Sequence, residues 1–243
     1  MRIESDPVEP IAGAPGALVL FSDIACPWST VAVLRLRAAR AELGLDEQLA
    51  IIHLAHPLEL THDIALPRRV IDAETVACAA TVPDFGWSLW QRSPDDYPVS
   101  TLLPLQAVQV ARLQSEAAAE ELDLALRRAL FVESRCITVL HEIRAAARNC
   151  RTLDIDLMLL RLEAGFGQAA IFRQSRLARA GAAACSGQIV LPDGSSYCNP
   201  GIDAGWIGPP MPRGVPVVRS DDASAFRDLV RKAAIATVEE AVP

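Results

Sequence analysis

The sequence predicts an α/β fold in which a block of helices is inserted into a small sheet. Residues 16–56 have the pattern of a β-α-β unit, and residues 187–201 have the pattern of a β-hairpin. Repeated helical spacing fills residues 101–180 between them, and a further helical pattern follows the hairpin. Together these observations give the order β-α-β, helical block, β-hairpin, α.

The β-α-β unit begins with the apolar run "GALVLFSD" at residues 16–23, which predicts a buried strand. Helical spacing runs from Pro27 to a stop at Gly44. The apolar run "QLAIIHLAH" at residues 48–56 predicts a second strand. A helical crossover joins two such strands in parallel, with a right-handed connection.

The middle of the chain predicts an α-helical subdomain. It is preceded by a long loop at residues 81–100, which contains three prolines and four aromatic residues. Within the block, Leu122, Leu126 and Ala129 recur at i, i+4 and i+7, with charged residues on the other faces. The expected helices cover residues 101–114, 116–132, 137–148, 154–164 and 166–180.

Strands return in "GQIVLPDGSSYCNPG", where Asp193-Gly194 is a standard hairpin turn signal. We expect a Pro/Gly-rich loop over residues 199–216, and a last helix that starts at Asp222 or Ser224. The complete order is that of a thioredoxin-like fold with an all-α insertion. The predicted parts are a loose N-terminal arm at 1–15, a thioredoxin-like domain at 16–65 and 182–243, and a helical insertion subdomain at 66–181.

The composition limits the classes of partner. The chain has 243 residues, of which 51% are hydrophobic, and a formal net charge of −7. Nucleic acids and anionic membranes attract basic surfaces, so neither is expected as the main partner. No apolar stretch is long enough to span a bilayer, and the acidic, proline-bearing start "MRIESDPVEP" is unlike a secretory signal. These features predict a cytoplasmic, soluble protein.

The six cysteines form no CxxC pair, and no Cys/His cluster has the spacing of a zinc site. We therefore expect no metal site. In a reducing compartment each cysteine would be a free thiol. Free cysteines are usually buried as small hydrophobic side chains, and Cys78, Cys136 and Cys150, which fall in helical patterns, are expected to be core or surface thiols.

Cys26 differs from the others because of its place in "SDIACPWST". It follows the first predicted strand and precedes Pro27, a residue favoured at the first position of a helix, so Cys26 is predicted at the N-cap. Its sulfur would face free backbone N–H groups and the positive end of the helix dipole. Both favour a thiolate, so we expect a lowered pKa and a nucleophilic role for Cys26.

Ser29 stands one helical turn after Cys26, where a CxxC redox site would have its second thiol. A hydroxyl cannot attack a mixed disulfide, which excludes a dithiol cycle between positions 26 and 29. The hydroxyl is instead expected to hydrogen-bond the Cys26 sulfur or a bound thiolate. We assign Ser29 a catalytic role beside Cys26.

The segment "FSDIACPWS" resembles the active-site strand and helix start of the DsbA-like thioredoxin-fold family, and especially its FrnE-like and actinobacterial branch. The resemblance implies a thioredoxin fold and thiol chemistry. Kappa-class glutathione transferases and 2-hydroxychromene-2-carboxylate isomerases are related proteins that use serine in place of the first cysteine and bind glutathione. The resemblance continues, in order, in "HPLEL" (56–60), "DAE" (72–74), "FGWSLWQRSPDDYPVSTL" (85–102), "LRRALFVESRCI" (126–137) and "LPDGSSYCNPGI" (191–202).

Two departures from the family pattern are present: CPWS in place of CxxC, and Gly187 where a cis-proline is usual. The resemblance implies that Ser186 and Gly187 lie beside the active site, where they would contact substrate. Cys185 is then either a resolving thiol for Cys26 or an unpaired, packed cysteine. We favour the second for both Cys185 and Cys198, because sequence alone does not supply the distance that a disulfide demands.

Aromatic residues complete the candidate substrate-binding set. Pro27 and Trp28 begin the helix beside Cys26. Trp87 and Trp90 lie in the 81–100 loop, with two further aromatic residues, Phe85 and Tyr97. The loop aromatics either cap an apolar pocket over Cys26 or attach the helical subdomain to the sheet, and we hold the two equal.

His56 ends the second strand at the sheet edge where thioredoxin-fold sites lie, so it is a candidate acid or base, whereas His53 is expected in the core. The arginine pairs at 68–69 and 127–128 are interpreted as solvated faces. Alternatively, either pair would bind the carboxylate of a low-molecular-weight thiol.

The favoured function is single-thiol enzyme chemistry through Cys26. It is either thiol–disulfide exchange with glutathione or mycothiol as co-substrate, without a tightly bound cofactor, or thiol-assisted isomerisation or transfer on a small molecule, such as a natural product. The alternative from another class is a redox-inactive binding module that keeps the groove and has lost turnover. A homodimer through the helical block is compatible with each.

Overall fold

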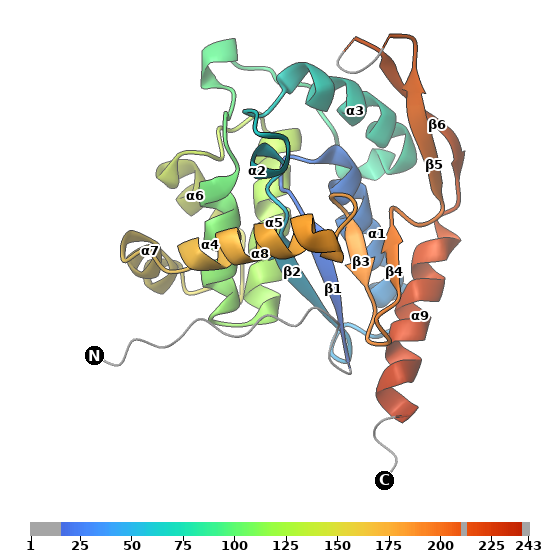
Figure 1. Cartoon of the computed structure of the whole chain (residues 1–243). Helices are drawn as coiled ribbons and strands as arrows, with labels where there is room; N and C mark the ends of the chain where they lie inside the picture. The colour runs from blue at the N-terminus through green and yellow to red at the C-terminus, as the bar shows by residue number, and fades with distance from the viewer. Residues whose placement is uncertain (1–15, 210–212, 240–243) are drawn as a thin grey trace.

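In the computed structural model, which describes residues 16–209 and 213–239, a four-stranded sheet lies between two layers of helices (Figure 1). The strand order is β2-β1-β3-β4; β1 and β2 are parallel, and β3 is antiparallel to both of its neighbours. The predicted arm at 1–15 lies outside the described residues. The strands are β1 (Ala17–Ser22), β2 (Ala50–Ala55), β3 (Gln188–Val190) and β4 (Ser196–Cys198).

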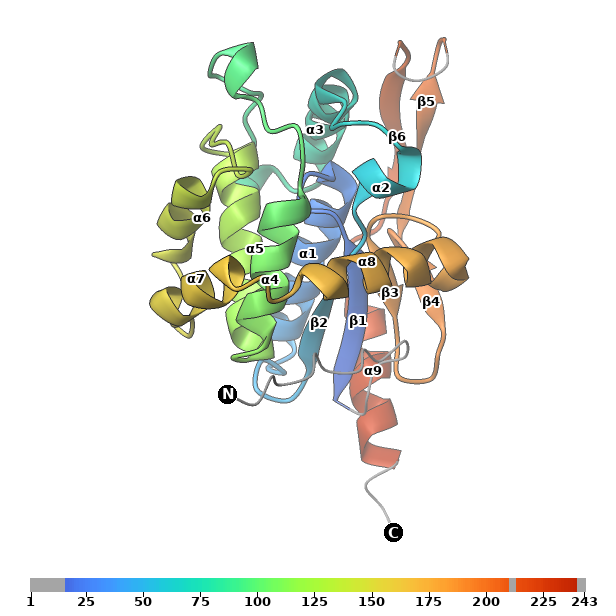
Figure 2. The ribbon, with the colours of Figure 1, turned by 60° about the vertical axis from the view of Figure 1, so that its left-hand side comes forward.

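Both faces of the central strand β1 are covered, which explains why its sequence is a continuous apolar run. Leu18 and Leu20 pack with helices α1 and α9 on one face, and Val19 and Phe21 pack towards the α8–η3 segment on the other. Figure 2 shows α8 crossing that second face. These elements are α1 (Pro27–Glu42), α8 (Gln168–Leu177), the π-helical turn η3 (Ala178–Ala182) and α9 (Ser224–Glu239).

The remaining helices lie between β2 and β3 in the chain. They build a separate apolar core in which Leu122 and Leu126 are fully buried. The predicted helices of this block are confirmed within a few residues. No bounds were predicted for the helix at 68–81, α3, although Cys78 was placed in a helical pattern. The elements are α2 (Leu58–His62), α3 (Arg68–Thr81), η1 (Pro83–Phe85), η2 (Pro94–Asp96), α4 (Leu102–Arg112), α5 (Glu116–Phe131), α6 (Leu140–Ala147) and α7 (Ile155–Glu163).

The prediction of a loop over residues 199–216 is wrong. Strands β5 (Ile202–Ile207) and β6 (Val215–Asp221) pair there as an antiparallel two-stranded sheet that packs against α3. Pro216 argues against a strand in the sequence because it has no N–H to donate. It is tolerated here because each strand of a two-stranded sheet is an edge strand.

Candidate active site

Cys26 is the N-cap of α1, as predicted, and Pro27 begins the helix. Its backbone is extended, with φ −86° and ψ 117°, and its sulfur accepts the Ser29 N–H at 3.5 Å. The Cys26 side chain is only 6% exposed. The sulfur therefore lies at the positive end of a helix dipole but is buried from solvent.

This burial reverses the expected pKa. Burial raises the pKa of the Cys26 thiol to about 11, and the negative charge of Glu74 adds to the increase. Hydrogen bonds from Ser186 and from the Ser29 N–H act in the opposite direction and are weaker. The prediction of a lowered pKa is wrong. It considered the helix N-terminus alone and not the burial of the sulfur by residues from other parts of the chain.

A cavity of about 350 Å³ opens beside Cys26, between the start of α1 and the helices α2 and α3. Its wall is mainly apolar, and besides Cys26 three of its residues, Glu59, His62 and Glu74, carry ionisable side chains. The apolar part of the wall is made by Ala25, Pro27, Leu58, Ile64, Leu66, Pro67, Val70 and Ile71. The cavity can hold a small, largely apolar molecule against the sulfur.

Glu74 is a candidate functional residue that was not singled out from the sequence. Burial raises its pKa to about 7, and a hydrogen bond from the Trp28 side chain opposes the increase. A carboxyl group with this pKa exchanges its proton near neutral pH, which suits an acid or base. The spacing of Ile71, Glu74 and Cys78 at i, i+3 and i+7 was the available signal for a helix that brings Glu74 to the site.

Glu74→Gln is expected to lower the apparent pKa of Cys26 by about 1 pH unit, because it removes a nearby like charge. The measurement is the rate of Cys26 alkylation by iodoacetamide against pH, read by peptide mass spectrometry. Asp72→Asn is the control, since Asp72 is on the same helix and pairs with Arg68. An unchanged profile in Glu74→Gln would show that Glu74 does not act on the sulfur.

The Ser29 hydroxyl does not bond the Cys26 sulfur, which differs from the prediction. It is fully buried, 2.8 Å from the Asp23 carbonyl oxygen and 3.1 Å from the Cys26 carbonyl oxygen, and it accepts a hydrogen bond from Arg127 at 3.0 Å. The backbone N–H of Ser29, not its side chain, contacts the sulfur. Ser29 therefore holds the helix start in place rather than touching substrate.

Arg127 was interpreted as part of a solvated face, and this is wrong. Its side chain is 0% exposed and pairs with Asp123 at 2.7 Å. It reaches the helix start through the Asp23 carbonyl oxygen at 3.1 Å and the Thr30 hydroxyl at 2.9 Å. An arginine so occupied does not bind a substrate carboxylate; it fixes the loop that carries Cys26. The Asp123–Arg127 spacing of i, i+4 was the available signal.

Asp23 organises the same loop from the other side. Its carboxylate accepts the backbone N–H groups of Ala25 at 2.9 Å and Leu58 at 2.8 Å, and the Thr101 hydroxyl at 3.1 Å. Burial raises its pKa, and these donors oppose the increase. The Asp23 backbone N–H donates to the Ser186 hydroxyl at 2.9 Å, which joins the Cys26 loop to the turn before β3.

Gly187 lies against the helix start, as the resemblance implied. Its backbone has φ +100°, and its N–H donates to the Phe21 carbonyl oxygen at 2.8 Å. A proline has no N–H and a fixed negative φ, so it cannot replace this residue. A side chain here would also crowd its neighbours, because a Cβ would be 2.8 Å from Asn199 Oδ1 and 3.3 Å from Ser29 Cα, so both would have to shift.

Gly187→Ala is expected to cost roughly 1–3 kcal/mol of unfolding free energy, since it combines an unfavourable φ with a close approach to the Cys26 helix. Gly194→Ala is the matched control. Gly194 has φ +80°, but nothing lies within 4 Å of a Cβ there. Urea denaturation of both variants measures the difference, and equal losses would contradict a tight contact at Gly187.

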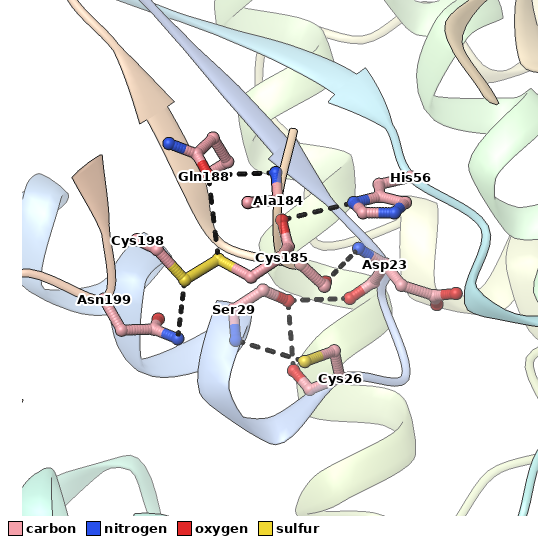
Figure 3. The surroundings of a disulfide bond; sticks show 10 residues. Asp23, Cys26, Ser29, His56, Ala184, Cys185, Gln188, Cys198 and Asn199 are labelled. Atoms are coloured by element: carbon pink, nitrogen blue, oxygen red, sulfur yellow. Dashed lines mark hydrogen bonds between the residues drawn. A yellow bond between two sulfur atoms is a disulfide. The ribbon is translucent and has the colours of Figure 1, made fainter. Parts of the chain in front are cut away.

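Cys185 and Cys198 form a disulfide (Figure 3), so the expectation that both are unpaired is wrong. The β3–β4 hairpin brings them to a Cα–Cα distance of 6.2 Å, within the range that a disulfide needs. Cys185 is consequently not a free resolving thiol for Cys26 in this state. Cys26, Cys78, Cys136 and Cys150 are free thiols.

His56 is near this turn but does not line the cavity. It is buried, its Nδ1 donates to the Cys185 carbonyl oxygen at 3.2 Å, and burial lowers its pKa. His56 thus supports the turn as a neutral ring. His53 is in the core, as predicted.

Trp87 and Trp90 do not cap the cavity beside Cys26. Trp87 packs on Phe85 and Phe131, and its indole donates to the Val82 carbonyl oxygen at 2.9 Å. Trp90 stacks edge-on against Tyr97. The interpretation as a cap over Cys26 is therefore wrong. The named contacts of both tryptophans lie within the core of the helical block, and none of them joins the block to the sheet.

The structure is similar to several solved structures of DsbA-like proteins. A probable DsbA oxidoreductase from Streptomyces coelicolor superimposes with a TM-score of 0.61 at 18% identity, over 93% of this chain and 92% of that one. The chain has a DsbA-like thioredoxin fold. The cytosolic disulfide reductase DsbM from Pseudomonas aeruginosa, also solved with GSH, gives a TM-score of 0.51 at 14% identity, over 92% and 98% of the two chains.

A 2-hydroxychromene-2-carboxylate isomerase shares the DsbA-like fold too, with a TM-score of 0.54 at 16% identity over 74% of this chain and 87% of that one. No family model matches the sequence, and no curated protein matches it significantly. Within the described residues, no helix is long and apolar enough to cross a membrane.

Proposed function

We propose that the chain is an enzyme that carries out thiol–disulfide exchange through the single thiol Cys26, with a low-molecular-weight thiol such as glutathione or mycothiol as second substrate. One observation carries the proposal. Cys26 lies at a helix N-terminus on the wall of an apolar cavity that also contains Glu74, a carboxyl group with a pKa of about 7.

Glu74 supplies the proton transfers that a buried thiol needs. Its carboxylate accepts the Cys26 proton as the sulfur attacks a disulfide R–S–S–R. The S–S bond of the substrate breaks, and the leaving sulfur takes the electron pair and the proton from Glu74. The products are a Cys26–S–S–R mixed disulfide and one thiol, R–SH.

The second half returns the enzyme to its first state. The low-molecular-weight thiolate attacks the R sulfur of the mixed disulfide, and Cys26 leaves and regains its proton. The net reaction converts one disulfide and one thiol into another disulfide and another thiol. An external thiol is needed because position 29 is a serine and Cys185 is already paired.

Cys78 is a free thiol that interacts electrostatically with Cys26 and that the proposal does not use. It lies one helical turn after Glu74 on α3 and is fully buried. Burial raises its pKa, and negative charge on Cys26 adds to the increase. A thiol held neutral in this way is a poor nucleophile.

The cavity favours a disulfide with an apolar substituent, since its polar atoms are few. DsbM, which has the same fold, has been solved with GSH. A glutathione-type co-substrate and a cytoplasmic location are consistent with that likeness and are part of the proposal.

The experiment is steady-state reduction of an aromatic disulfide by glutathione. The proposal predicts acceleration over the uncatalysed reaction and ping-pong kinetics, with parallel double-reciprocal lines, because a covalent intermediate separates the two substrates. No acceleration over the uncatalysed rate would favour a binding module instead.

The apolar wall of the cavity supports one second candidate, thiol-assisted isomerisation of a small conjugated molecule. Cys26 would add to a conjugated double bond, the resulting single bond would rotate, and elimination would return the thiol with no net redox change. Isomerisation of a conjugated enone acid, together with failure to turn over disulfides, would select this candidate.

A further inference from the structure

The Cys185–Cys198 disulfide lies next to the candidate site and has no role in the proposed exchange at Cys26. It joins the turn before β3 to the end of β4, across 13 residues of sequence. Ser186 and Gly187 follow Cys185 directly and contact Asp23 and Ser29, as described above. The disulfide therefore fastens a turn that holds the Cys26 loop.

The two sulfur atoms differ in accessibility. Cys198 is exposed and lines a second cavity of about 250 Å³, whose wall also includes Trp28 and Trp206. Cys185 is half-buried, and its carbonyl oxygen is held by His56. An incoming thiolate reaches Cys198 more readily than Cys185, and access decides which sulfur of a disulfide is attacked.

The surroundings suit the products of an exchange. Asn199 Nδ2 lies 3.9 Å from the Cys198 sulfur, so it can donate to a thiolate there. Asn199 Oδ1 is buried and has no hydrogen-bond partner within the described residues. Gln188 Oε1 lies 4.0 Å from the Cys185 sulfur and can accept from its S–H after reduction (Figure 3).

Asn199 also adopts φ +43°, a left-handed conformation in which asparagine is enriched. The unpartnered buried oxygen lies beside an exposed disulfide, and a redox role of the pair is one reason for keeping such a polar group there.

We propose that Cys185–Cys198 is a second redox site, at which a low-molecular-weight thiol enters at Cys198. The thiolate attacks the Cys198 sulfur, the bond to Cys185 breaks, and Cys185 leaves with the electron pair and takes a proton from water. A second low-molecular-weight thiolate then attacks the mixed disulfide at the sulfur that came from the first low-molecular-weight thiol, and Cys198 is released as a thiolate. Two thiols become one disulfide, and the protein disulfide gains two electrons.

This second site does not depend on Cys26 chemistry, because no step passes through Cys26. The two aromatic side chains of the Cys198 cavity, Trp28 and Trp206, give it a surface for the carbon skeleton of the thiol. Trp28 also hydrogen-bonds Glu74, so it contacts both sites.

The test uses the intact protein and its Cys26→Ser variant in buffers of graded glutathione and glutathione disulfide, with circular dichroism recorded in parallel. Rapid alkylation and peptide mass spectrometry then measure the reduced fraction of the pair. The proposal predicts reversible reduction of the folded protein, in both proteins alike. Reduction only after the circular dichroism signal is lost would overturn it, since that is the behaviour of a structural disulfide.

Two variants identify the sulfur that is attacked. With glutathione disulfide, Cys198 in the Cys185→Ser variant is expected to form the mixed disulfide at least about tenfold faster than Cys185 in the Cys198→Ser variant, because of its greater access. Equal rates, or a faster reaction at Cys185, would overturn entry at Cys198. If either variant does not fold, the titration of the intact protein still decides whether the pair is redox-active.

Discussion

Cys26→Ser is expected to abolish disulfide turnover, with a loss on the order of 10³-fold or more in catalysed rate, because it removes the atom that forms the mixed disulfide. The fold is expected to persist. Serine is among the preferred N-cap residues, so its oxygen can accept the Ser29 N–H that the sulfur accepts now. The measurements are glutathione-dependent reduction of an aromatic disulfide and urea denaturation.

Cys136→Ser is the matched control, since Cys136 is a free, half-buried thiol that packs against the helical core and does not line the Cys26 cavity. It should retain full activity. Turnover that survives in Cys26→Ser would transfer the chemistry to another group and contradict the proposed function.

Arg127→Leu is expected to cost about 3–5 kcal/mol of unfolding free energy, because it leaves a buried carboxylate, Asp123, without its arginine partner. Burial acts to raise the pKa of Asp123, but Arg127 and His53 hold that pKa well below its usual range. The same change removes the hydrogen bonds to Ser29 and to the Asp23 carbonyl oxygen. Loss of order at the Cys26 loop should therefore accompany the loss of stability.

Arg128→Ala is the control. It shows whether the loss of stability in Arg127→Leu comes from the buried network or from the removal of any arginine on α5. Arg128 is the next residue on α5, is exposed, and lies over the Phe85 ring at 5.6 Å. Its removal should cost no more than about 1 kcal/mol. Urea denaturation gives both values, and a similar small cost for Arg127→Leu would mean that the buried network contributes little.

The fold could be predicted from local pattern because its elements have strong local signals. The apolar run of β1, the proline that starts α1 and the Asp193-Gly194 turn each specify their structure over a few residues. The β5–β6 pair could not be predicted in this way. Its strands contain glycine and proline, which are depleted in strands, and the segment between them is rich in the same two residues, so the local pattern indicates a loop.

The position of Cys26 was predictable for the same reason, since an N-cap is a local feature. Its environment was not, because α3, which is distant in sequence, supplies Glu74 and contributes to the cover that raises the pKa of the thiol. The burial of Arg127 and the Cys185–Cys198 disulfide depend in the same way on how separate segments pack.

The most direct test of the central claim is the site and pH dependence of adduct formation by brief exposure to glutathione disulfide, mapped by peptide mass spectrometry. The account predicts a mixed disulfide at Cys26 whose rate of formation rises as Glu74 loses its proton near pH 7. It rises again towards pH 11 as the thiol itself ionises. In Glu74→Gln the first rise should be absent. A protein that forms adducts at Cys136 or Cys150 and none at Cys26 would contradict the account.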